Sequence, residues 1–376
     1  MKITGIDVHE LRVPGWTGES FDGSYDNCIV LVHSDDGLTG IAEVDSVPSV
    51  IRAIIEAVPS HRHAMGLRAS LQGFDVSDPV AAWERMYDCT HYYGRRGAVV
   101  HAISAIDIAL WDLKGKREGR SVADLLGKPQ RARVKAYGTI YPLGDSVDEV
   151  RRNIDRGLAL GLKAIKICAE PHWRQDFAKA ERLIRAARDH VGPDINLMID
   201  AAAAWFRPED GLPLMPLFNE LCFEWVEAPL PLDDVVGHRR FQGFGVPIGG
   251  GDLGLTTRHE FAHLLDEGQV DIAQPDVTMV GGLTEMMRVA AYAWSRGKRV
   301  VPHGYKSNIT IAANLAFLAQ GSGEEFCEYS TSRSPLRWDL TEESFEIGDD
   351  GRIAVPDRPG LGVTLNMETV GKFALS

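Results

Sequence analysis

Apolar and polar residues alternate with a period of two at the start of the chain and then change to a helical period. The segment 2–13 alternates, 27–34 is an apolar run, and SDDGLTG (34–40) has the turn residues of a hairpin. Residues 47–126 are mostly helical by pattern, and within them 99–119 carries apolar residues at helical spacing before Lys, Arg and Gly. We therefore predict an antiparallel meander followed by helices.

From residue 133 the pattern changes to strand-like runs that alternate with stretches of helix length. GLKAIKIC (161–168) precedes the amphipathic segment 176–192, which leads into INLMID (195–200), and this rhythm continues to about residue 330. Strands that alternate with helices predict a parallel sheet, and about eight such units predict closure into a βα-barrel. The pattern after Ser330 is irregular, and we expect this tail to return to the amino-terminal domain.

The composition of the chain limits the classes of molecule that it is expected to bind. A chain of 376 residues can hold one large and one smaller domain, and its net charge of −13 argues against nucleic acid or an anionic membrane surface. The five cysteines are scattered without CxxC spacing, which favours reduced thiols in a cytoplasmic protein. We find neither a secretory signal nor an apolar stretch long enough to span a bilayer.

Acidic residues stand at or just past the ends of successive strand-like runs. Side chains at the carboxyl ends of parallel strands converge on one mouth of a barrel, where barrel enzymes place their chemistry. Asp200, Glu227 and Asp252 come from three consecutive runs and offer the hard oxygen donors that Mg²⁺ prefers. A single strand-end acid often only caps the following helix, but three in succession favour one metal site.

Three further residues extend this pattern. Lys166, one run before the first of these acids, would hold a substrate carboxylate against the metal unless it is a solvated strand-edge lysine. His303 lies one run after Asp276, and an Asp–His hydrogen bond would make the imidazole a general base rather than a structural histidine. Glu328, among other acids, is expected to have a raised pKa and to donate a hydrogen bond as a neutral acid, unless its role is structural.

Several segments are candidates for contact with the substrate. We expect Tyr305 and Lys306, just after the predicted base, to face the cavity. The loop 16–25 and the segments 45–50 and 91–96 are expected to approach the distal end of the substrate.

These residues stand in segments that resemble the enolase superfamily, in its mandelate racemase/muconate lactonizing enzyme branch. The resemblance covers essentially the whole chain and implies a modified (β/α)8-type barrel with one Mg²⁺, under an α+β capping domain built from both termini. We assign residues 1–127 to the capping domain, 128–335 to the barrel and 336–376 to the returning tail. The matching segments are AISAIDIALWDLKGK (102–116), GLKAIKI (161–167), LMID (197–200), WVEAPL (225–230), PIGGGD (247–252), QPDVTMVGG (274–282) and VPHG (301–304).

The resemblance also implies abstraction of the proton α to a carboxylate. Asp276 with His303 resembles the dyad of the mandelate racemase-like subgroup, whereas the lactonizing subgroup would have a lysine in place of Asp276. The family commonly has Lys-x-Lys on the second strand and Asp-x-Asn on the third, but this chain has Cys168 and Ala202 at the second positions. We interpret Cys168 as an inert filler rather than an acidic group. With one base, a two-base racemase is disfavoured.

The leading hypothesis is an acid-sugar dehydratase, an Mg²⁺-dependent lyase acting on a small-molecule carboxylate. The alternatives are a sugar-lactone cycloisomerase, an epimerase on the same scaffold and a non-catalytic member, since fold alone does not choose among them. Because members of the family commonly self-associate, we also expect a homo-oligomer.

Overall fold

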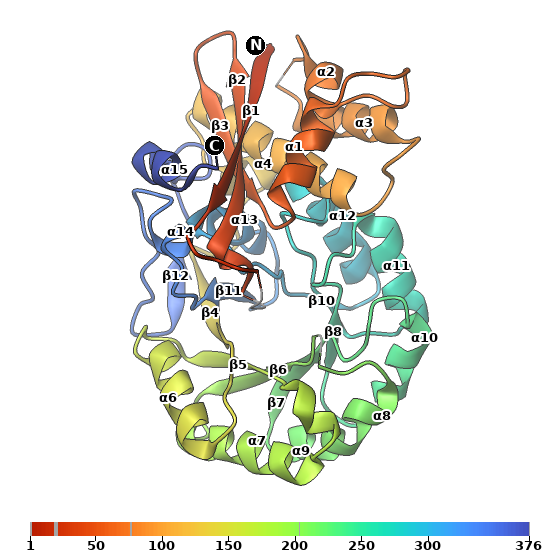
Figure 1. The fold of residues 1–376 in the computed structure, drawn as a ribbon, viewed down its shortest axis with the longest axis vertical. Helices are drawn as coiled ribbons and strands as arrows, with labels where there is room; N and C mark the ends of the chain where they lie inside the picture. The colour runs from red at the N-terminus through yellow and green to blue at the C-terminus, as the bar shows by residue number, and fades with distance from the viewer. Residues whose placement is uncertain (1, 19–21, 76, 203, 376) are drawn as a thin grey trace.

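The amino-terminal part of the chain forms an antiparallel sheet of order β1-β2-β3 covered by helices (Figure 1). The computed structural model describes residues 2–18, 22–75, 77–202 and 204–375. The predicted alternation is visible in β1, where Ile6, Val8 and Leu11 are buried while Asp7 is exposed. The elements are β1 Ile3–Arg12, β2 Asp26–Ser34, β3 Thr39–Val44, α1 Pro48–Glu56, α2 Leu67–Leu71, α3 Pro79–Thr90, α4 Ala98–Glu118 and α5 Val122–Leu126.

The remainder of the chain builds a curled parallel sheet with the strand order β10-β9-β8-β7-β6-β5-β4-β11. Neighbouring strands are parallel throughout this path, as the predicted strand–helix alternation requires. The expected α/β barrel is therefore confirmed, with an open seam where no described residues pair β10 with β11. The strands are β4 Arg133–Ile140, β5 Ala164–Cys168, β6 Asn196–Asp200, β7 Phe223–Glu227, β8 Ile248–Gly250, β9 Ile272–Ala273, β10 Arg299–Val300 and β11 Phe326–Ser330.

Helices cover the outside of this sheet, as Figure 1 shows. Each parallel strand from β4 to β10 is followed by at least one helix before the next strand, which is the connection that parallel strands need. The covering helices are α6 Val147–Leu158, α7 Phe177–Val191, α8 Pro208–Gly211, α9 Met215–Glu220, α10 Val235–His238, α11 Thr257–Glu267, α12 Gly282–Ser295 and α13 Asn308–Leu318.

The last strands before the candidate base are shorter than the sequence pattern predicts. The run 271–276 yields only β9, and 299–303 yields only β10. Pro275 and Pro302 interrupt both ladders because proline has no N–H to donate. The pairing resumes beyond them, since the backbone N–H of His303 donates to the carbonyl of Pro275 at 3.1 Å.

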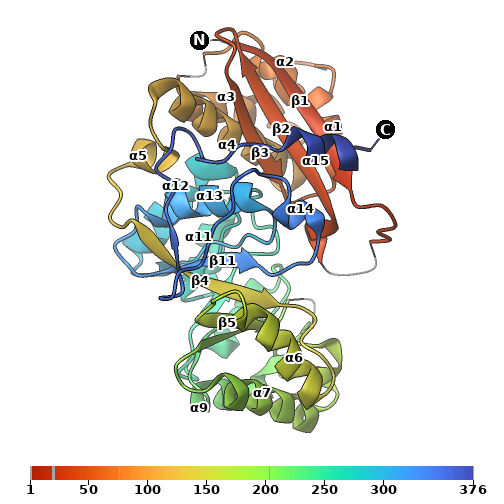
Figure 2. The ribbon, with the colours of Figure 1, turned by 90° about the vertical axis from the view of Figure 1, so that its left-hand side faces the viewer.

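Buried polar contacts join the capping helices and sheet to the barrel. Glu43 of β3 accepts hydrogen bonds from the backbone N–H groups of Ser307 (3.0 Å) and Thr310 (2.9 Å) at the start of α13. Asp107 of α4 accepts hydrogen bonds from the backbone and hydroxyl of Thr284 on α12. These contacts hold the capping layer over one end of the barrel, as both ribbon views show (Figures 1 and 2).

The carboxyl-terminal tail contacts both layers. Its strand β12 (Arg352–Ala354) pairs antiparallel with β4, and the N–H of Leu375 donates to the carbonyl of Glu10 in β1. Figure 2 shows α15 (Met367–Phe373) beside the capping sheet and α14 (Pro335–Trp338) beneath it. The expected return of the tail to the amino-terminal sheet is therefore visible, although β12 belongs to the barrel sheet.

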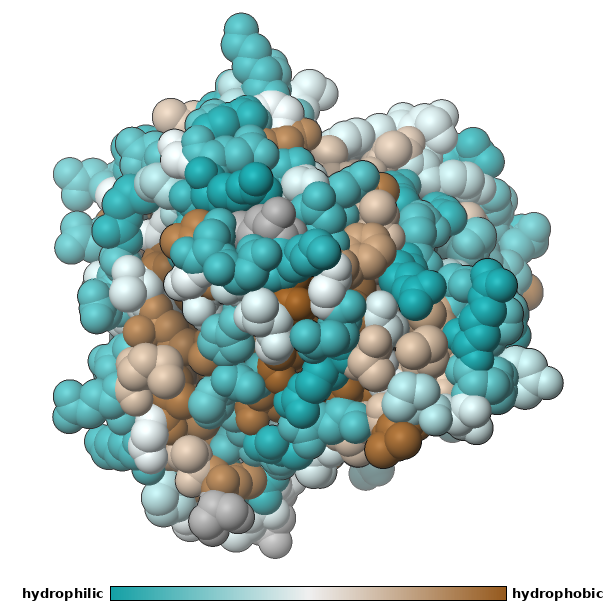
Figure 3. Space-filling model, turned by 90° about the horizontal axis from the view of Figure 1, so that it is seen from above, coloured by the Kyte–Doolittle hydropathy of each residue, from teal (hydrophilic) through white to brown (hydrophobic). Residues whose placement is uncertain are grey.

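The surface seen from the capping side is mainly hydrophilic, with hydrophobic side chains in small groups between charged ones (Figure 3). All five cysteines are free thiols. Among the described helices, none combines the length and apolarity needed to cross a bilayer.

Candidate functional site

The two-residue period of the barrel strands decides which side chains reach the mouth. On β5, β6 and β7 the residues Ala164, Met198 and Trp225 point into a small interior core. Side chains two positions further along a strand lie on the same face, so Lys166, Asp200 and Glu227 follow them toward the carboxyl end. The interior core forms the floor of the site and comprises Tyr137, Ala164, Met198, Trp225, Ile272, Val301 and Phe326.

Asp200, Glu227 and Asp252 form a carboxylate cluster with ligand oxygens within 4.8 Å of one another. The Asp252 Oδ1 atom is buried and has no hydrogen-bond partner among the described residues. Burial, followed by the negative charges of Glu227 and Asp200, raises the pKa of the Asp252 carboxyl to about 8. A compact set of buried oxygens with excess negative charge fits a divalent cation such as Mg²⁺.

Neighbouring side chains orient Glu227. Its Oε2 accepts hydrogen bonds from Trp225 Nε1 at 2.9 Å and from Gln274 Nε2 at 2.5 Å. Gly249 leaves the space for this contact, because a Cβ atom there would lie 2.0 Å from Gln274 Oε1. Gly249 therefore serves packing around the cluster, and Oε1 of Glu227 accepts a hydrogen bond from Lys166 Nζ.

Lys166 lies among the carboxylates rather than at a solvated strand edge. Its side chain is 1% exposed, and its Nζ atom pairs with Glu227 Oε1, with Asp200 Oδ2 at 3.3 Å and with Glu328 Oε1 at 3.2 Å. Burial would lower the pKa of this lysine, but the surrounding carboxylates, Glu227 first, raise it well above its usual value. Lys166 is thus a buried ammonium whose partners are the carboxylates of the site.

His303 and Asp276 form the predicted hydrogen-bonded pair. His303 Nδ1 lies 2.7 Å from Asp276 Oδ2, while Asp276 Oδ1 accepts hydrogen bonds from the backbone and hydroxyl of Thr278 at 2.6 and 2.7 Å. A carboxylate already filled with donors orients the imidazole with a proton on Nδ1 and leaves Nε2 toward the cavity. Burial lowers the pKa of His303, but Glu328 and Asp276 raise it well above its usual value.

The expectation that Glu328 is a neutral acid is wrong for this arrangement. Burial alone would raise its pKa, but Lys166, His303 and hydrogen bonds from Thr139 Oγ1 and the Gly304 N–H (2.9 Å) lower the pKa to about 2. The nearby cations therefore outweigh the nearby acids. Glu328 is an ionised acceptor with Oε2 at 3.8 Å from His303 Nε2.

A cavity of about 230 Å³ connects these groups under the capping loops. Asp200, Asp252, His303 and Glu328 line it together with Tyr305 and Cys168. Lys166, Glu227 and Asp276 are not among its lining residues, although each contacts one that is. Sequence reasoning missed Thr139, which follows the interior Tyr137 by two residues and could have been found by the strand period. Other lining residues that it did not single out are Tyr141, Leu253 and Met279.

Two of the three segments that are expected near the distal end of the substrate contribute residues to this cavity. Asp22 and Gly23 of the loop 16–25 and Asp45 of the segment 45–50 line it, whereas no residue of 91–96 does. Residues 19–21 of that loop lie outside the described part of the chain.

Lys306 does not line the cavity, so its position does not favour the predicted contact with substrate. Its buried Nζ atom donates to the carbonyl of Gly23 at 2.5 Å and pairs with Asp45 Oδ1 at 3.1 Å. A lysine next to the base in sequence is thus directed away from it, toward the capping loop. Lys306 fastens the capping loops to the barrel.

We expect Lys306→Met to lower the free energy of unfolding by about 3 kcal/mol, because it leaves the half-buried Asp45 without its counter-ion. Urea unfolding would measure this loss. The double variant Lys306→Met with Asp45→Asn should recover part of it, and Lys372→Met, an exposed control, should be neutral. An unchanged midpoint in the single variant contradicts the anchoring role.

Cys168 occupies the position on β5 where the resemblance predicts a second lysine. It lines the cavity, but burial and then the charge of Asp200 raise the pKa of its thiol well above the usual value. The thiol is therefore protonated near neutral pH and is a poor base.

We expect Cys168→Ala to keep most of the turnover, within about threefold, because the neutral thiol takes no proton from the substrate. Steady-state kinetics on the wild type and the variant would check this. A loss of several orders of magnitude in a variant with an unchanged circular dichroism spectrum would make the thiol catalytic.

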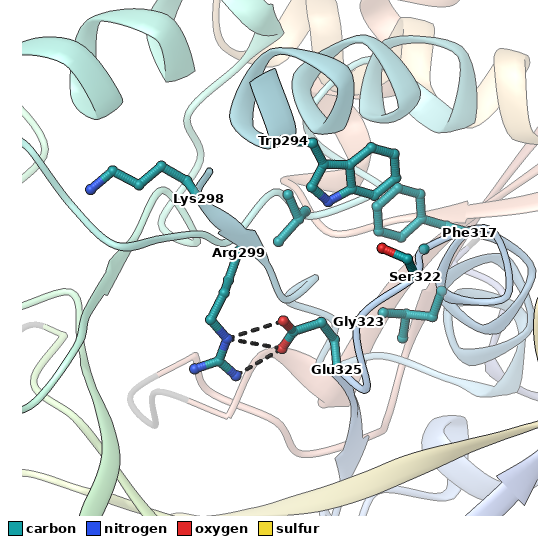
Figure 4. A pocket seen from close by; sticks show the side chains of 10 residues that line it. Trp294, Lys298, Arg299, Phe317, Ser322, Gly323 and Glu325 are labelled. Atoms are coloured by element: carbon teal, nitrogen blue, oxygen red, sulfur yellow. Dashed lines mark hydrogen bonds and ion pairs between the residues drawn. The ribbon is translucent and has the colours of Figure 1, made fainter. Parts of the chain in front are cut away.

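A separate cavity of about 200 Å³ lies where β10 and β11 begin, away from these residues (Figure 4). Its walls include the stacked rings of Trp294 and Phe317 and the ion pair of Arg299 with Glu325 at 2.7 Å. None of the predicted site residues lines it. The candidate chemistry is therefore confined to the carboxyl ends of the strands.

The fold and the site together define a barrel protein with clustered carboxylates and a histidine–aspartate pair under a capping domain. Residues 146–369 match the family described as enolase C-terminal domain-like, and residues 20–127 match the mandelate racemase/muconate lactonizing enzyme N-terminal domain. The chain belongs to the mandelate racemase/muconate lactonizing enzyme family of the enolase superfamily. The resemblance seen in the sequence is therefore confirmed.

Relatives of this chain include enzymes that act on different acid sugars. It is 31% identical to D-galactarolactone cycloisomerase of Agrobacterium fabrum, over 100% of this chain and 99% of that protein. It is 33% identical to arabinonate dehydratase of Saccharolobus solfataricus, over 75% of this chain and 74% of the relative. A racemase from Streptomyces coelicolor A3(2), solved with bound magnesium, superposes with a TM-score of 0.86 at 28% identity, covering 99% of this chain and 100% of the racemase.

Proposed function

We propose that this chain is an Mg²⁺-dependent acid-sugar dehydratase, which converts an aldonate or aldarate to its 2-keto-3-deoxy product. The observation that supports this most is the imidazole–carboxylate pair of His303 with Asp276, whose imidazole lines the same cavity as Asp200 and Asp252 of the carboxylate cluster that fits a divalent cation. Cys168 stands where a second base would be expected and has a raised thiol pKa. One base suits an elimination better than a racemisation.

The residues divide the reaction between binding and proton transfer. Asp200, Glu227 and Asp252 would hold Mg²⁺, which when bound draws electron density from the substrate carboxylate and acidifies the α-carbon. Lys166 donates hydrogen bonds to the same carboxylate. Its buried charge favours the extra negative charge that develops there.

His303 first accepts the α-proton and later donates a proton to the departing hydroxyl. In its neutral form the imidazole removes the α-proton through Nε2, and the resulting imidazolium is stabilised by Asp276 and by the ionised Glu328, the same groups that raise its pKa. The C–O bond at the β-carbon then breaks, and the imidazolium protonates the departing hydroxyl so that water leaves. The enol that remains takes a proton at the β-carbon and becomes the 2-keto-3-deoxy acid.

A sugar-lactone cycloisomerase is the second candidate, and the full-length similarity to D-galactarolactone cycloisomerase favours it. This reaction also begins with removal of an α-proton, but the ring oxygen is the leaving group. A carboxylate that leaves from a lactone needs no proton, whereas hydroxide does. The protonated His303 therefore matters more to a dehydration than to a lactone opening.

Parallel assays on open-chain acids and their lactones test the proposal. A library of aldonates and aldarates would be incubated with Mg²⁺, and the 2-keto product would be trapped with semicarbazide. Formation of semicarbazone from an open-chain acid supports the dehydratase. Product from lactones alone makes the chain a cycloisomerase, and interconversion of epimers without any ketone excludes both eliminations.

A further inference from the structure

A second cavity adjoins the one that holds the candidate catalytic groups. It has a volume of about 210 Å³ and shares Asp22 and Tyr141 with the first cavity, so the two are neighbours along one path from the strand ends. Its other walls come from the capping loop, from α6 and from the segment after β11. They are Trp16, Tyr25, Pro142, Arg156, Thr331, Ser332 and Arg333.

Two arginines in these walls have no counter-ion among the described residues. Among the described residues, neither Arg156 of α6 nor Arg333 makes a hydrogen bond or ion pair through its guanidinium. Other arginines, such as Arg185 and Arg299, are paired with carboxylates, whereas these two guanidinium groups line the same cavity. Burial lowers the pKa of Arg156, and the positive charge of Arg333 lowers it further, which shows that the two cations act on each other.

Two like charges beside one cavity repel each other unless an anion lies between them. Guanidinium groups donate paired hydrogen bonds in a planar fork, which matches a carboxylate or a phosphate. The side chain of Arg156 on α6 is partly buried, and that of Arg333, after β11, is exposed. Both line the same cavity, so an anion that enters it can meet both.

Asp22, which lies between the two cavities, can bind the hydroxyl groups of a substrate but not a second anionic group. The carboxylate of Asp22 accepts hydrogen bonds from Ser332 Oγ at 2.7 Å and from the Ser24 N–H at 3.0 Å, and it faces both cavities. A carboxylate accepts hydrogen bonds from sugar hydroxyls but repels a second anion. The stacked rings of Trp16 and Tyr25, with centroids 4.4 Å apart, provide a further wall of the outer cavity.

Resting on the proposed function, we propose that the substrate is a dianionic acid sugar whose second anionic group lies between Arg156 and Arg333. One carboxylate binds at Lys166 and the carboxylate cluster, the hydroxylated carbons pass Asp22, and the distal anion pairs with both arginines. An open-chain aldarate has this charge pattern, as does a 6-phosphoaldonate, whereas an aldonate or an aldarolactone has only one negative charge.

Kinetics on matched substrates test this assignment. Galactarate and galactonate, glucarate and gluconate, and gluconate 6-phosphate would be compared at fixed Mg²⁺. We expect kcat/KM to favour a dianion over its matched monoanion by about 100-fold, because two charge-assisted hydrogen-bonding groups distinguish them. Arg156→Ala and Arg333→Ala should each reduce this ratio about tenfold, whereas Arg152→Ala, an exposed arginine of α6, should not change it. A larger kcat/KM ratio for aldarate over aldonate identifies the distal group as a carboxylate. A larger ratio for gluconate 6-phosphate over gluconate identifies it as a phosphate.

Binding experiments separate this assignment from the reaction itself. Calorimetry on the His303→Asn variant with Mg²⁺ would measure affinity for the same acids without turnover. Tighter binding of dianions that depends on Arg156 and Arg333 supports the assignment even if no acid is dehydrated. Equal affinity for dianions and monoanions, or a preference that both alanine variants retain, overturns it even if the chain dehydrates a monoacid.

Discussion

Replacement of His303 by asparagine is expected to lower the turnover of an acid sugar by about 10⁴-fold and to stop α-proton exchange with solvent. Asparagine keeps a polar group of similar size but cannot take a proton. The described residues place one imidazole at the cavity, with Nδ1 held by Asp276 at 2.7 Å. Proton NMR of the substrate in deuterated buffer measures exchange, and product trapping measures turnover.

Asp276→Asn is the matched comparison. It should reduce turnover less, by about 10- to 100-fold, because it weakens and misorients the base without removing it. Both variants should still bind Mg²⁺, since neither residue belongs to the carboxylate cluster. Continued exchange in the His303 variant would show that another group can reach the α-carbon, with the buried Lys166 as the first candidate, and an epimerase would then be the better proposal.

The second large effect on activity is expected from the loss of one carboxylate of the cluster. Asp200→Ala or Glu227→Ala should abolish Mg²⁺-dependent activity, because each removes an oxygen donor from a set of three. The fold should survive, since either change also relieves the crowding of negative charge that raises the pKa of Asp252. Calorimetric titration with Mg²⁺ and the shift in Tm on addition of Mg²⁺ both measure the loss.

Glu224 provides the control for this experiment. It lies on the same strand as Glu227 but on the other face, where it accepts a hydrogen bond from Asn196. Glu224→Ala should therefore keep both the binding of Mg²⁺ and the rise in Tm. Full activity of the Asp200 or Glu227 variant, or of the wild type in excess chelator, rules out the metal site.

The order of strands and the set of residues at their ends were readable from local pattern. Runs of apolar residues alternate with helical stretches, and parallel strands separated by helices leave few other arrangements. Because each side chain two positions on lies on the same face, the residues that reach the mouth follow from the strand boundaries alone. This is why the sequence predicts Asp200, Glu227, His303 and Glu328 at the mouth, whereas Thr139 has no charged side chain to mark it.

The ionisation state of a side chain and the direction in which it points depend on contacts between segments that are far apart in sequence. Glu328 was expected to be neutral, but its charge is set by Lys166 at 3.2 Å, which lies 162 positions earlier in the chain. Lys306 was expected at the cavity, yet its ammonium is drawn to Gly23 and Asp45 of the capping layer. The strand order and the residues at the mouth are thus encoded in local periodicity. The charge state of each residue and the pairing of its side chain arise only when the capping loops and barrel strands come together, because electrostatic energies depend on distance in space and on burial.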